Sequence, residues 1–535
     1  MVYKGLQIAD RHPTLTRLVL LAVGAVLTGL TLMFPQIGFI EWITLIPAGL
    51  VIMRLADEKI RPWRAYLLGL YFFMCYYLTV FHWFFELYPM EFTGMSHGSA
   101  MVVVLAGWLG LSLLQAVSGA LIFPIVVWFG RGRAAHRWPF VMPFLVGGLW
   151  ALMEWGQTFF WFGVPWGRLA LGQVNIPIMV RSASLFGSYF VTFMIVSVGM
   201  LLALAIVRPP HLKICALCAG GLVVLELLLG IGVTLGYSVQ DGSKTMRVAV
   251  LQGNISSSDK WNMSVEDIID EYSDLCIAAA EQGAKLIVWP ETALPITLEG
   301  NPTRIQRICN LAVSCNADLL VGLFTNDTEG RDQNSLVLFR RDGTISDEIY
   351  SKRHLVPFGE YLPMRRVIMT LIPPLAEVAM LENDLVPGAD SGLIQVDDVS
   401  IGSLICFDSI YEQLTRLSVL DGAQLIVLST NDSWFGDSAA LRMHNSHDQL
   451  RAIESGRTVI RAANTGISSV IGPDGTVIDC LDDNVQGIIV CDADIYSGIT
   501  LYTAIGNVWI YLIIIFILAL GVANLNKKNN CLKIV

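Results

Sequence analysis

The chain has 535 residues, of which 54% are hydrophobic and only 15% charged, and its formal net charge is −10 at pH 7. This hydropathy excludes an ordinary soluble globule, and the acidic balance excludes a nucleic-acid binder, which needs a basic face. The charge is uneven: residues 241–502 hold 18 Lys and Arg against 37 Asp and Glu, whereas the rest holds 17 against 8. An apolar, basic part therefore accompanies an acidic, soluble part.

Seven apolar runs precede the acidic part, and an eighth follows it. Because a membrane span needs about 20 apolar residues, we expect eight spanning helices. Their approximate limits are 15–34, 38–54, 64–84, 101–129, 141–156, 180–206, 212–236 and 503–524. No small-residue cleavage site follows the first run, which is expected to remain as a helix. The predicted domains are a seven-span region (1–240), a soluble domain (241–500) and a final span with a tail (501–535).

Basic residues gather on one side of the predicted spans. Fifteen Lys and Arg lie in the N-terminal segment, in the loops after the second, fourth and sixth spans, and in the C-terminal tail. The opposite loops contain Arg168 as their one basic residue. Since basic loops stay in the cytoplasm, both termini are predicted to be cytoplasmic. The soluble domain is then expected in the periplasm, on the outer side of a bacterial inner membrane.

Two segments on the predicted outer side are unusual. Residues 85–92 (FELYPMEF) are aromatic and acidic, and residues 159–168 (FFWFGVPWGR) combine aromatic residues with Gly and Pro. Each segment fits an interfacial aromatic belt, or a lipid-contacting rim beneath the soluble domain. Glu154, near the outer end of the fifth span, is expected to face protein or a cavity, because an ionisable group is costly in lipid.

The soluble domain alternates predicted strands and helices. Strands are expected at 245–255, 285–289, 318–325, 334–340, 399–405, 424–429, 458–463, 467–472 and 487–491. Helices are expected at 265–282, 302–316, 409–420 and 438–456, the first with a capping box of Ser264 and Asp267. This order, with a stretch of consecutive strands, predicts a layered α/β sandwich with one large core.

Reactive side chains stand where several of these strands end. Cys406 follows an apolar run, where a helix start lowers the pKa of a thiol and offers backbone N–H groups to an oxyanion. Glu291 follows another apolar run, and Lys352 and Glu360 lie in the segment KRHLVPFGE. A thiol, a carboxylate and a cation are the groups that acyl transfer through a thioester requires.

This order of Glu, Lys and Cys resembles the nitrilase (carbon–nitrogen hydrolase) superfamily. Within it, seven spans, an outer nitrilase-type domain and one final span are similar to the apolipoprotein N-acyltransferase family. The matching segments are 163–166, 251–255 with Trp261, 289–293, 352–361, Cys406, 431–437 and 461–466. The resemblance implies an eight-span helical bundle joined to an α-β-β-α sandwich.

The resemblance also implies roles for residues at matching positions. Glu291 matches the general base, Lys352 the cation and Cys406 the acylated nucleophile, with Glu360 in support. Two residues beside the nucleophile depart from the family, which often has Tyr and Glu where this chain has Phe407 and Asp408. The expected substrate-binding residues are Trp261, near the lipid pocket, and Trp434.

The implied reaction moves a fatty acyl chain from a phospholipid to the α-amino group of a diacylglyceryl-cysteine apolipoprotein, the last step of bacterial lipoprotein maturation. The expected partners are therefore the phospholipid, the apolipoprotein and the membrane, without nucleic acid, metal or cofactor, and the enzyme is expected to be a monomer. A membrane-anchored amidase or nitrilase that uses water remains an alternative, as does a transporter or scaffold with a degenerate domain.

Two further features carry alternatives of their own. Histidines in the soluble domain, His354, His444 and His447, allow a Cys–His dyad or a metal site, but the sequence shows no third ligand beside His444 and His447. The apolar loop 368–381 (IMTLIPPLAEVAML) is too hydrophobic for a solvated loop. We expect it to enter the outer leaflet or to cover the site as a lid.

Overall fold

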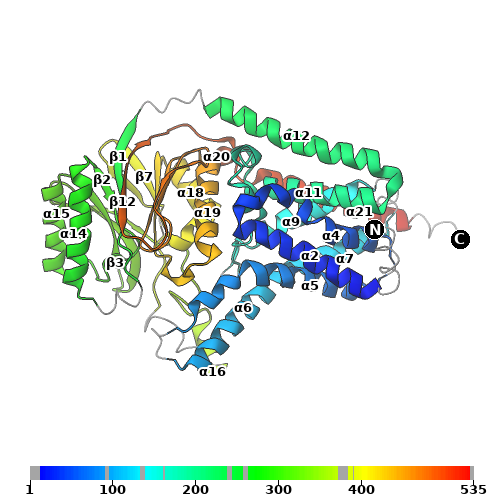
Figure 1. Cartoon of the computed structure of the whole chain (residues 1–535), viewed down its shortest axis with the longest axis horizontal. Coiled ribbons are helices and arrows are strands. Elements are labelled where there is room, and N and C mark those ends of the chain that lie inside the picture. The colour runs from blue at the N-terminus through cyan, green and yellow to red at the C-terminus, as the bar shows by residue number, and fades with distance from the viewer. Residues whose placement is uncertain are drawn as a thin grey trace. The chain divides into compact units, whose positions relative to one another are not determined.

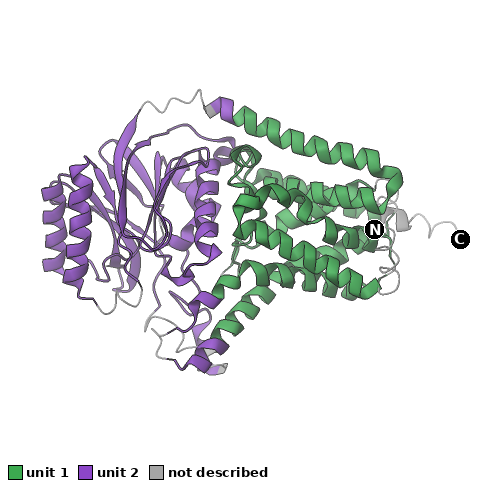
Figure 2. Cartoon of the chain, in the orientation of Figure 1, with its two compact units in different colours: residues 1–84, 103–233, 505–535 green, residues 85–102, 234–504 purple. Residues whose placement is uncertain are grey.

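The computed structural model describes residues 13–58, 60–90, 95–132, 139–160, 163–237, 244–256, 263–371, 384–389 and 391–529. Contacts divide the chain into two compact units (Figure 2). Unit 1 comprises Met1–Phe84, Val103–Val233 and Ile505–Val535, and unit 2 comprises Phe85–Val102 and Thr234–Ala504. The segment Phe85–Val102, whose first part was expected as a loop between spans, therefore belongs to the same compact unit as the soluble domain.

Unit 1 is helical, and a helix lies wherever a span was predicted (Figure 1). Its main helices are α2 (Pro13–Met33), α4 (Ile46–Leu55), α5 (Pro62–Val80), α6 (His97–Ala120), α7 (Ile122–Gly130), α9 (Val141–Gly156), α11 (Ser188–Val207), α12 (Leu212–Tyr237) and α21 (Val508–Asn529). The sixth predicted span begins late, at Ser188, because Gly187 takes φ 80° and interrupts the helix.

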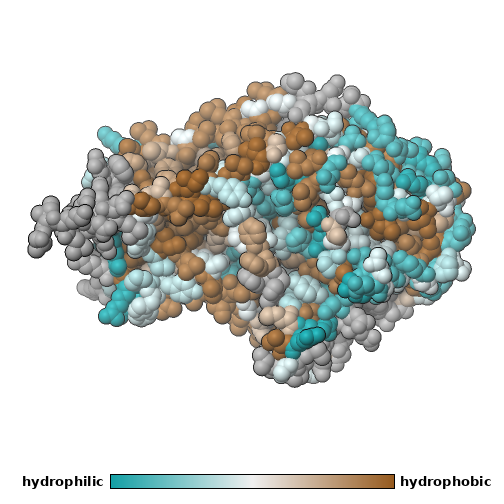
Figure 3. Space-filling model, turned by 180° about the vertical axis from the view of Figure 1, so that it is seen from behind, coloured by the Kyte–Doolittle hydropathy of each residue, from teal (hydrophilic) through white to brown (hydrophobic). Residues whose placement is uncertain are grey.

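Five helical segments among the described residues are long and apolar enough to cross a membrane. They are Pro13–Met33, Pro35–Leu55, His97–Gly130, Ser188–Val207 and Pro209–Gly236. Val141–Gly156 and Val508–Asn524 are shorter apolar helices. Apolar side chains also cover much of the outer surface of this unit (Figure 3), with Leu217 75% exposed. A contiguous apolar surface of this kind requires a membrane or a partner to cover it.

Unit 2 contains the predicted sandwich of two six-stranded sheets. The first sheet has the order β12-β1-β2-β3-β4-β5 and the second the order β11-β10-β9-β8-β7-β6. Helices α14 (Val265–Glu281) and α15 (Pro302–Cys315) cover the first sheet, and α18 (Glu412–Leu420) and α19 (Ala439–Ser455) lie beside the second (Figure 1). The α/β sandwich expected from the sequence is confirmed.

Successive side chains of a central strand point alternately to two buried faces of the sheet. Their bounds are β1 (Thr245–Gln252), β2 (Leu286–Val288), β3 (Asp318–Asn326), β4 (Asp332–Phe339), β5 (Ile345–Ser351), β6 (Leu393–Val396), β7 (Val399–Ile405), β8 (Leu425–Thr430), β9 (Val459–Ala463), β10 (Ser469–Ile471), β11 (Val477–Cys480) and β12 (Gly487–Asp494). In β1, Val248 and Val250 face the core between the sheets, whereas Ala249 and Leu251 face the helices. This period of two is that of a strand buried on both sides.

Three strands were not predicted, and each lies at an edge of its sheet: β5, β6 and β11. Edge strands have one partner and an exposed side, so their sequences need not be apolar. The sequence of β5, ISDEIYS, contains two carboxylates, and every residue of β11 is at least partly exposed. Neither strand therefore shows the apolar run by which central strands are recognised.

The strand that carries Cys406 has no room for an added methyl group. A Cβ on Gly402 in β7 would lie 2.9 Å from Ile426 Cδ1, 2.9 Å from Ser418 Cβ and 3.0 Å from Ala423 Cβ. We therefore expect Gly402→Ala to destabilise the protein by about 1–3 kcal/mol through overpacking. Thermal unfolding of the full chain in detergent measures this. The control is Gly300→Ala, whose nearest neighbour would be Thr297 Cβ at 3.9 Å. An unchanged melting temperature for Gly402→Ala would contradict the packing described.

Candidate active site

Cys406 stands at the carboxyl end of β7, where the chain turns into a short 3-10 helix, Cys406–Ile410. Its backbone has φ 48°, in the left-handed region that non-glycine residues rarely adopt. Such a conformation costs roughly 1–3 kcal/mol and persists where the surroundings enforce it, often at active sites. The half-buried thiol is thus presented on a sharp, strained turn.

Glu291, Lys352 and Glu360 form one buried charge cluster. The Lys352 Nζ lies 2.9 Å from Glu291 Oε1 and 2.9 Å from Glu360 Oε1. Lys352 is only 2% exposed and Glu291 5%. Glu291 follows β2 and Lys352 follows β5, so the ends of two strands of the first sheet supply the cluster. The structure therefore brings together the carboxylates and the cation that the sequence singled out.

Two asparagines complete the cluster, and neither was assigned a role from the sequence. The Asn334 Nδ2 donates to Glu291 Oε1 at 2.7 Å and to Glu360 Oε1 at 3.1 Å. The Asn431 backbone N–H donates to Glu291 Oε2 at 2.9 Å. Asn334 is 3% exposed, but it stands among four polar residues at the start of β4 (DQNSLVLF), so the sequence pattern does not distinguish it. These donors fix the orientation of the Glu291 carboxyl group.

The thiol of Cys406 is electrostatically coupled to this cluster. Burial raises its pKa well above the ordinary value, and Glu291 raises it further, whereas Lys352 lowers it. The outcome is opposite to the lowered thiol pKa expected from the helix start, because burial and a nearby carboxylate both disfavour a thiolate. Burial alone would lower the pKa of Lys352, but Glu291 and Glu360 outweigh it and raise that pKa well above its usual range. The resting site therefore pairs a protonated thiol with a charged lysine.

Asp408 holds the turn around the nucleophile. Its Oδ2 accepts from the Ile405 N–H at 3.1 Å and from the Tyr350 hydroxyl at 2.8 Å. Its Oδ1 accepts from the backbone N–H groups of Arg353 and His354 at 3.2 Å and 2.8 Å. Burial raises the pKa of Asp408 to about 6 despite these donors. This carboxylate joins the nucleophile turn to the residues that follow Lys352.

Phe407 and His354 pack on one aromatic ring. The Phe407 ring contacts the Tyr411 ring edge to face, with 5.5 Å between the ring centroids. The His354 ring stacks on the same Tyr411 ring, with 4.0 Å between the centroids. His354 is therefore engaged in packing, and burial lowers its pKa to about 4. An imidazole with so low a pKa is a weak base, so His354 is poorly suited to accept the proton of a thiol in a Cys–His dyad.

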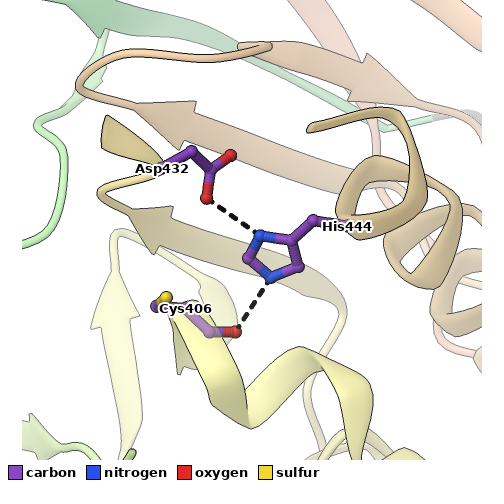
Figure 4. A group of neighbouring side chains, drawn as sticks. All are labelled: Cys406, Asp432 and His444. Carbon is purple, nitrogen blue, oxygen red and sulfur yellow. Dashed lines mark hydrogen bonds and ion pairs between the residues drawn. The ribbon is translucent and has the colours of Figure 1, made fainter. Parts of the chain in front are cut away.

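A second buried charge group lies behind Cys406 (Figure 4). The ring of His444 on α19 has Nδ1 2.9 Å from Asp432 Oδ1 and Nε2 3.3 Å from the Cys406 carbonyl oxygen. The Arg461 guanidinium forms ion pairs with Asp432 and Asp448. Burial raises the pKa of Asp432, but Arg461 and His444 outweigh it and hold that pKa at about 2.

Cys406, Asp432 and His444 each offer a metal-ligand atom, and these atoms lie within 4.8 Å of one another. This group differs from the His444–His447 pair considered from the sequence. The donors nevertheless fit a cation poorly, because both Asp432 oxygens are already engaged by His444, Thr430 and Arg461. A cation there would have to break a buried ion pair and would face a guanidinium.

The structure describes one of the two predicted substrate-binding tryptophans. Trp434 is half-buried in the short 3-10 helix Ser433–Phe435, whereas Trp261 lies outside the described residues. The next residue after that helix, Gly436, has φ 49°, and a Cβ there would lie 2.5 Å from Glu86 Oε2. Residues 372–381 of the expected lid also lie outside the described residues; the helix α16 (Arg365–Leu371) precedes them.

Comparisons with known proteins match both parts of the chain. A carbon–nitrogen hydrolase family model matches residues 247–499, and a model of the apolipoprotein N-acyltransferase N-terminal domain matches residues 24–201. An apolipoprotein N-acyltransferase from Gloeobacter violaceus is 31% identical over 505 residues, covering 91% of this chain and 90% of the relative. One from Geobacter metallireducens is 29% identical over 522 residues, covering 95% of both.

One solved structure is similar to about half of this chain. An amidase of the nitrilase superfamily from Nesterenkonia AN1 is 21% identical and covers 48% of this chain and 93% of its own, with a TM-score of 0.37.

The coupling of Cys406 to Glu291 predicts an effect on thiol reactivity. Glu291→Gln removes the carboxylate that raises the pKa of Cys406, so iodoacetamide alkylation of Cys406 should begin at lower pH than in the wild type. Mass spectrometry of the alkylated peptide across a pH series measures this midpoint. Glu299→Gln, on an exposed loop, is the control and should leave the midpoint unchanged. An unchanged or higher midpoint in Glu291→Gln would contradict the coupling.

Proposed function

Since this chain belongs to the apolipoprotein N-acyltransferase family, we propose that its acyl transfer proceeds through a thioester on Cys406. The enzyme is an N-acyltransferase of the carbon–nitrogen hydrolase superfamily. The donor is a membrane phospholipid and the acceptor is the α-amino group of an S-diacylglyceryl-cysteine apolipoprotein. The observation that supports this best is the buried pairing of Lys352 with two carboxylates, 2.9 Å from each, coupled to a thiol on a strained turn.

The first half-reaction forms the thioester. Glu291 takes the proton from the Cys406 thiol, which must be removed because the resting thiol is protonated. The sulfur attacks the ester carbonyl of the phospholipid, and the resulting oxyanion is met by Lys352 and the Phe407 backbone N–H. As the oxyanion collapses, the C–O bond breaks and Glu291 returns its proton to the leaving lysophospholipid oxygen.

The second half-reaction uses the same groups in turn. The apolipoprotein amine attacks the thioester carbonyl, and Glu291 takes a proton from the amine. The C–S bond then breaks, the amide product leaves, and the proton returns to Cys406. Both substrates occupy one site successively, which is a ping-pong mechanism. Glu360 contributes by holding Lys352, and Asp408 by holding the turn, so both support the reaction without touching substrate. We assign substrate contact to Trp434 and, by the family resemblance, to Trp261.

The five long apolar helices support a membrane location, and membership of the family supports the bacterial inner membrane. We propose eight spans, formed by the five long apolar segments together with α5, α9 and α21. Residues 1–240 and 501–535 then form the membrane part, and residues 241–500 the catalytic domain. The excess of basic residues on one side of the spans supports cytoplasmic termini and a periplasmic catalytic domain. We expect the enzyme to act as a monomer.

Incubation with phospholipid alone should leave an acyl chain on Cys406 of the wild-type enzyme, detectable by intact-protein and peptide mass spectrometry. Glu291→Gln should lower this acylation by about 10²-fold or more, because no base remains for the thiol. Lys352→Arg should fail as well, since a planar guanidinium does not fit the place of a compact ammonium.

Cys406→Ala is the control for the site of labelling, and Cys406→Ser should be nearly inactive because an alkoxide forms less easily than a thiolate. Acyl label on another residue, or acylation of Glu291→Gln at the wild-type rate, would refute the assigned roles. Release of free fatty acid at the same rate with and without a diacylglyceryl peptide would identify a hydrolase that uses water.

The proposed orientation can be checked with two native cysteines. Cys480 is exposed on the sandwich, and Cys531 lies in the predicted cytoplasmic tail. In variants that keep one of them and have alanine or serine at the other, a membrane-impermeant maleimide added to spheroplasts should label Cys480 at once. Cys531 should react only after the membrane is broken, because the reagent does not cross it. Labelling of Cys531 in intact spheroplasts would reverse the orientation.

A further inference from the structure

The peptide group between Cys406 and Phe407 has two functional ends. Its N–H belongs to Phe407 and is the backbone donor to the oxyanion in the proposed reaction. Its carbonyl oxygen, the Cys406 oxygen, lies 3.3 Å from His444 Nε2 (Figure 4). A peptide group is planar and trans, so its N–H and C=O point in opposite directions. A side chain that holds the carbonyl therefore also sets the direction of the N–H.

The hydrogen-bond partners assign the donor atoms of His444. Asp432 is ionised, since its pKa is held at about 2, and its Oδ1 at 2.9 Å from Nδ1 can only accept. The Cys406 carbonyl can likewise only accept, so its hydrogen bond with His444 requires a proton on Nε2. Ser409 Oγ also lies 3.2 Å from Nε2, and Arg461 Nη2 lies 3.2 Å from Nδ1.

The group behind His444 is built to keep the ring in this place. Asp432 is bound by the Arg461 guanidinium and by the Thr430 hydroxyl, the latter at 2.9 Å. Arg461 is fully buried and its second partner, Asp448, stands one turn beyond His444 on α19. Buried charges of this kind are stable only when each is paired, which makes the arrangement rigid.

The effect on catalysis follows from hydrogen-bond cooperativity. A donor bound to a peptide carbonyl polarises that peptide and strengthens the hydrogen bond that its N–H makes. A donor that is itself hydrogen-bonded to an ionised aspartate does so more strongly than water. The strained φ of 48° at Cys406 also means that this peptide needs to be held.

We propose that His444, held by Asp432 and Arg461, is a positioning residue that orients and polarises the Cys406–Phe407 peptide, so that the Phe407 N–H binds the oxyanion. The inference rests on the proposed function in one respect, that Cys406 is the nucleophile. This role is indirect, because His444 contacts neither Glu291, the base for the Cys406 thiol, nor the substrate. It also predicts that steps with a tetrahedral intermediate depend on His444, whereas direct displacement by the same thiol does not.

The test compares two reactions of Cys406 in the full-length enzyme. Acylation by p-nitrophenyl butyrate forms an oxyanion, whereas alkylation by iodoacetamide is a direct displacement and forms none. For His444→Ala we expect the limiting rate of acylation to fall by about 10-fold or more, as for a weakened oxyanion donor, with an unchanged KM for the ester. The rate of alkylation and its pH midpoint should remain at the wild-type values.

His444→Gln restores a single N–H donor toward the carbonyl and should recover much of the acylation rate. His447→Gln is the matched control, because His447 is equally buried on the same helix, and it should acylate normally. Melting temperatures of all three variants confirm that the compared proteins are folded.

Four results would overturn the inference. The first is acylation of His444→Ala within about threefold of the wild-type rate. The second is an equal loss of acylation and alkylation in His444→Ala, which would indicate a general disturbance of the turn. The third is a loss of acylation in His447→Gln as large as that in His444→Ala, and the fourth is a shifted pH midpoint of alkylation, which would make His444 a base for the thiol. If the wild type itself is alkylated at Cys406 but acylated elsewhere by the ester and by phospholipid, the proposed function fails instead, together with the role that it assigns to the Phe407 N–H.

Discussion

The active site depends on a lysine that is buried between two carboxylates. Removing an ammonium from water costs several kcal/mol, and only close partners repay that cost. Glu291 and Glu360 provide them through their Oε1 atoms, to which Asn334 also donates. The backbone N–H groups of Asn431 and Val356 bind the Oε2 atoms of Glu291 and Glu360. Burial and the nearby Glu291 raise the pKa of the Cys406 thiol more than Lys352 lowers it, so the thiol is protonated at rest.

The two sheets meet at this site, and hydrogen bonds between them fix the positions of its residues relative to one another. Asp408, from the turn after β7, accepts from Tyr350 on β5 and from the backbone after Lys352. The Ser429 hydroxyl on β8 donates to the carbonyl of Trp289 at 2.9 Å, and Trp289 stands two residues before Glu291. Nucleophile and base thus come from different sheets but are fixed to each other by hydrogen bonds, which gives the precision that covalent catalysis needs.

The sequence predicted the parts of this arrangement that follow from local pattern. Apolar runs located the central strands, and two reactive residues, Glu291 and Cys406, could be read at their ends. Lys352 follows the edge strand β5 and was recognised from the segment KRHLVPFGE instead. The edge strands β5 and β11 were missed because a half-exposed strand needs no apolar run, and β6 was missed because it has only four residues. The thiol pKa was expected to be low, since the helix start is visible in a sequence but the depth of burial and the distance to Glu291 are not. For the same reason His444 was considered only as a dyad or metal ligand, whereas its contact is with a main-chain carbonyl, which no side-chain motif encodes.

The catalytic unit is discontinuous along the chain, because Phe85–Val102 belongs to it although β1 begins at Thr245. The Glu86 carboxylate beside Gly436 is the point at which the early segment approaches the loop after β8. During synthesis this early segment leaves the ribosome long before the sandwich does, so the unit closes only after the intervening helices have been made. A gene fragment limited to residues 241–500 therefore encodes an incomplete unit, because it lacks Phe85–Val102.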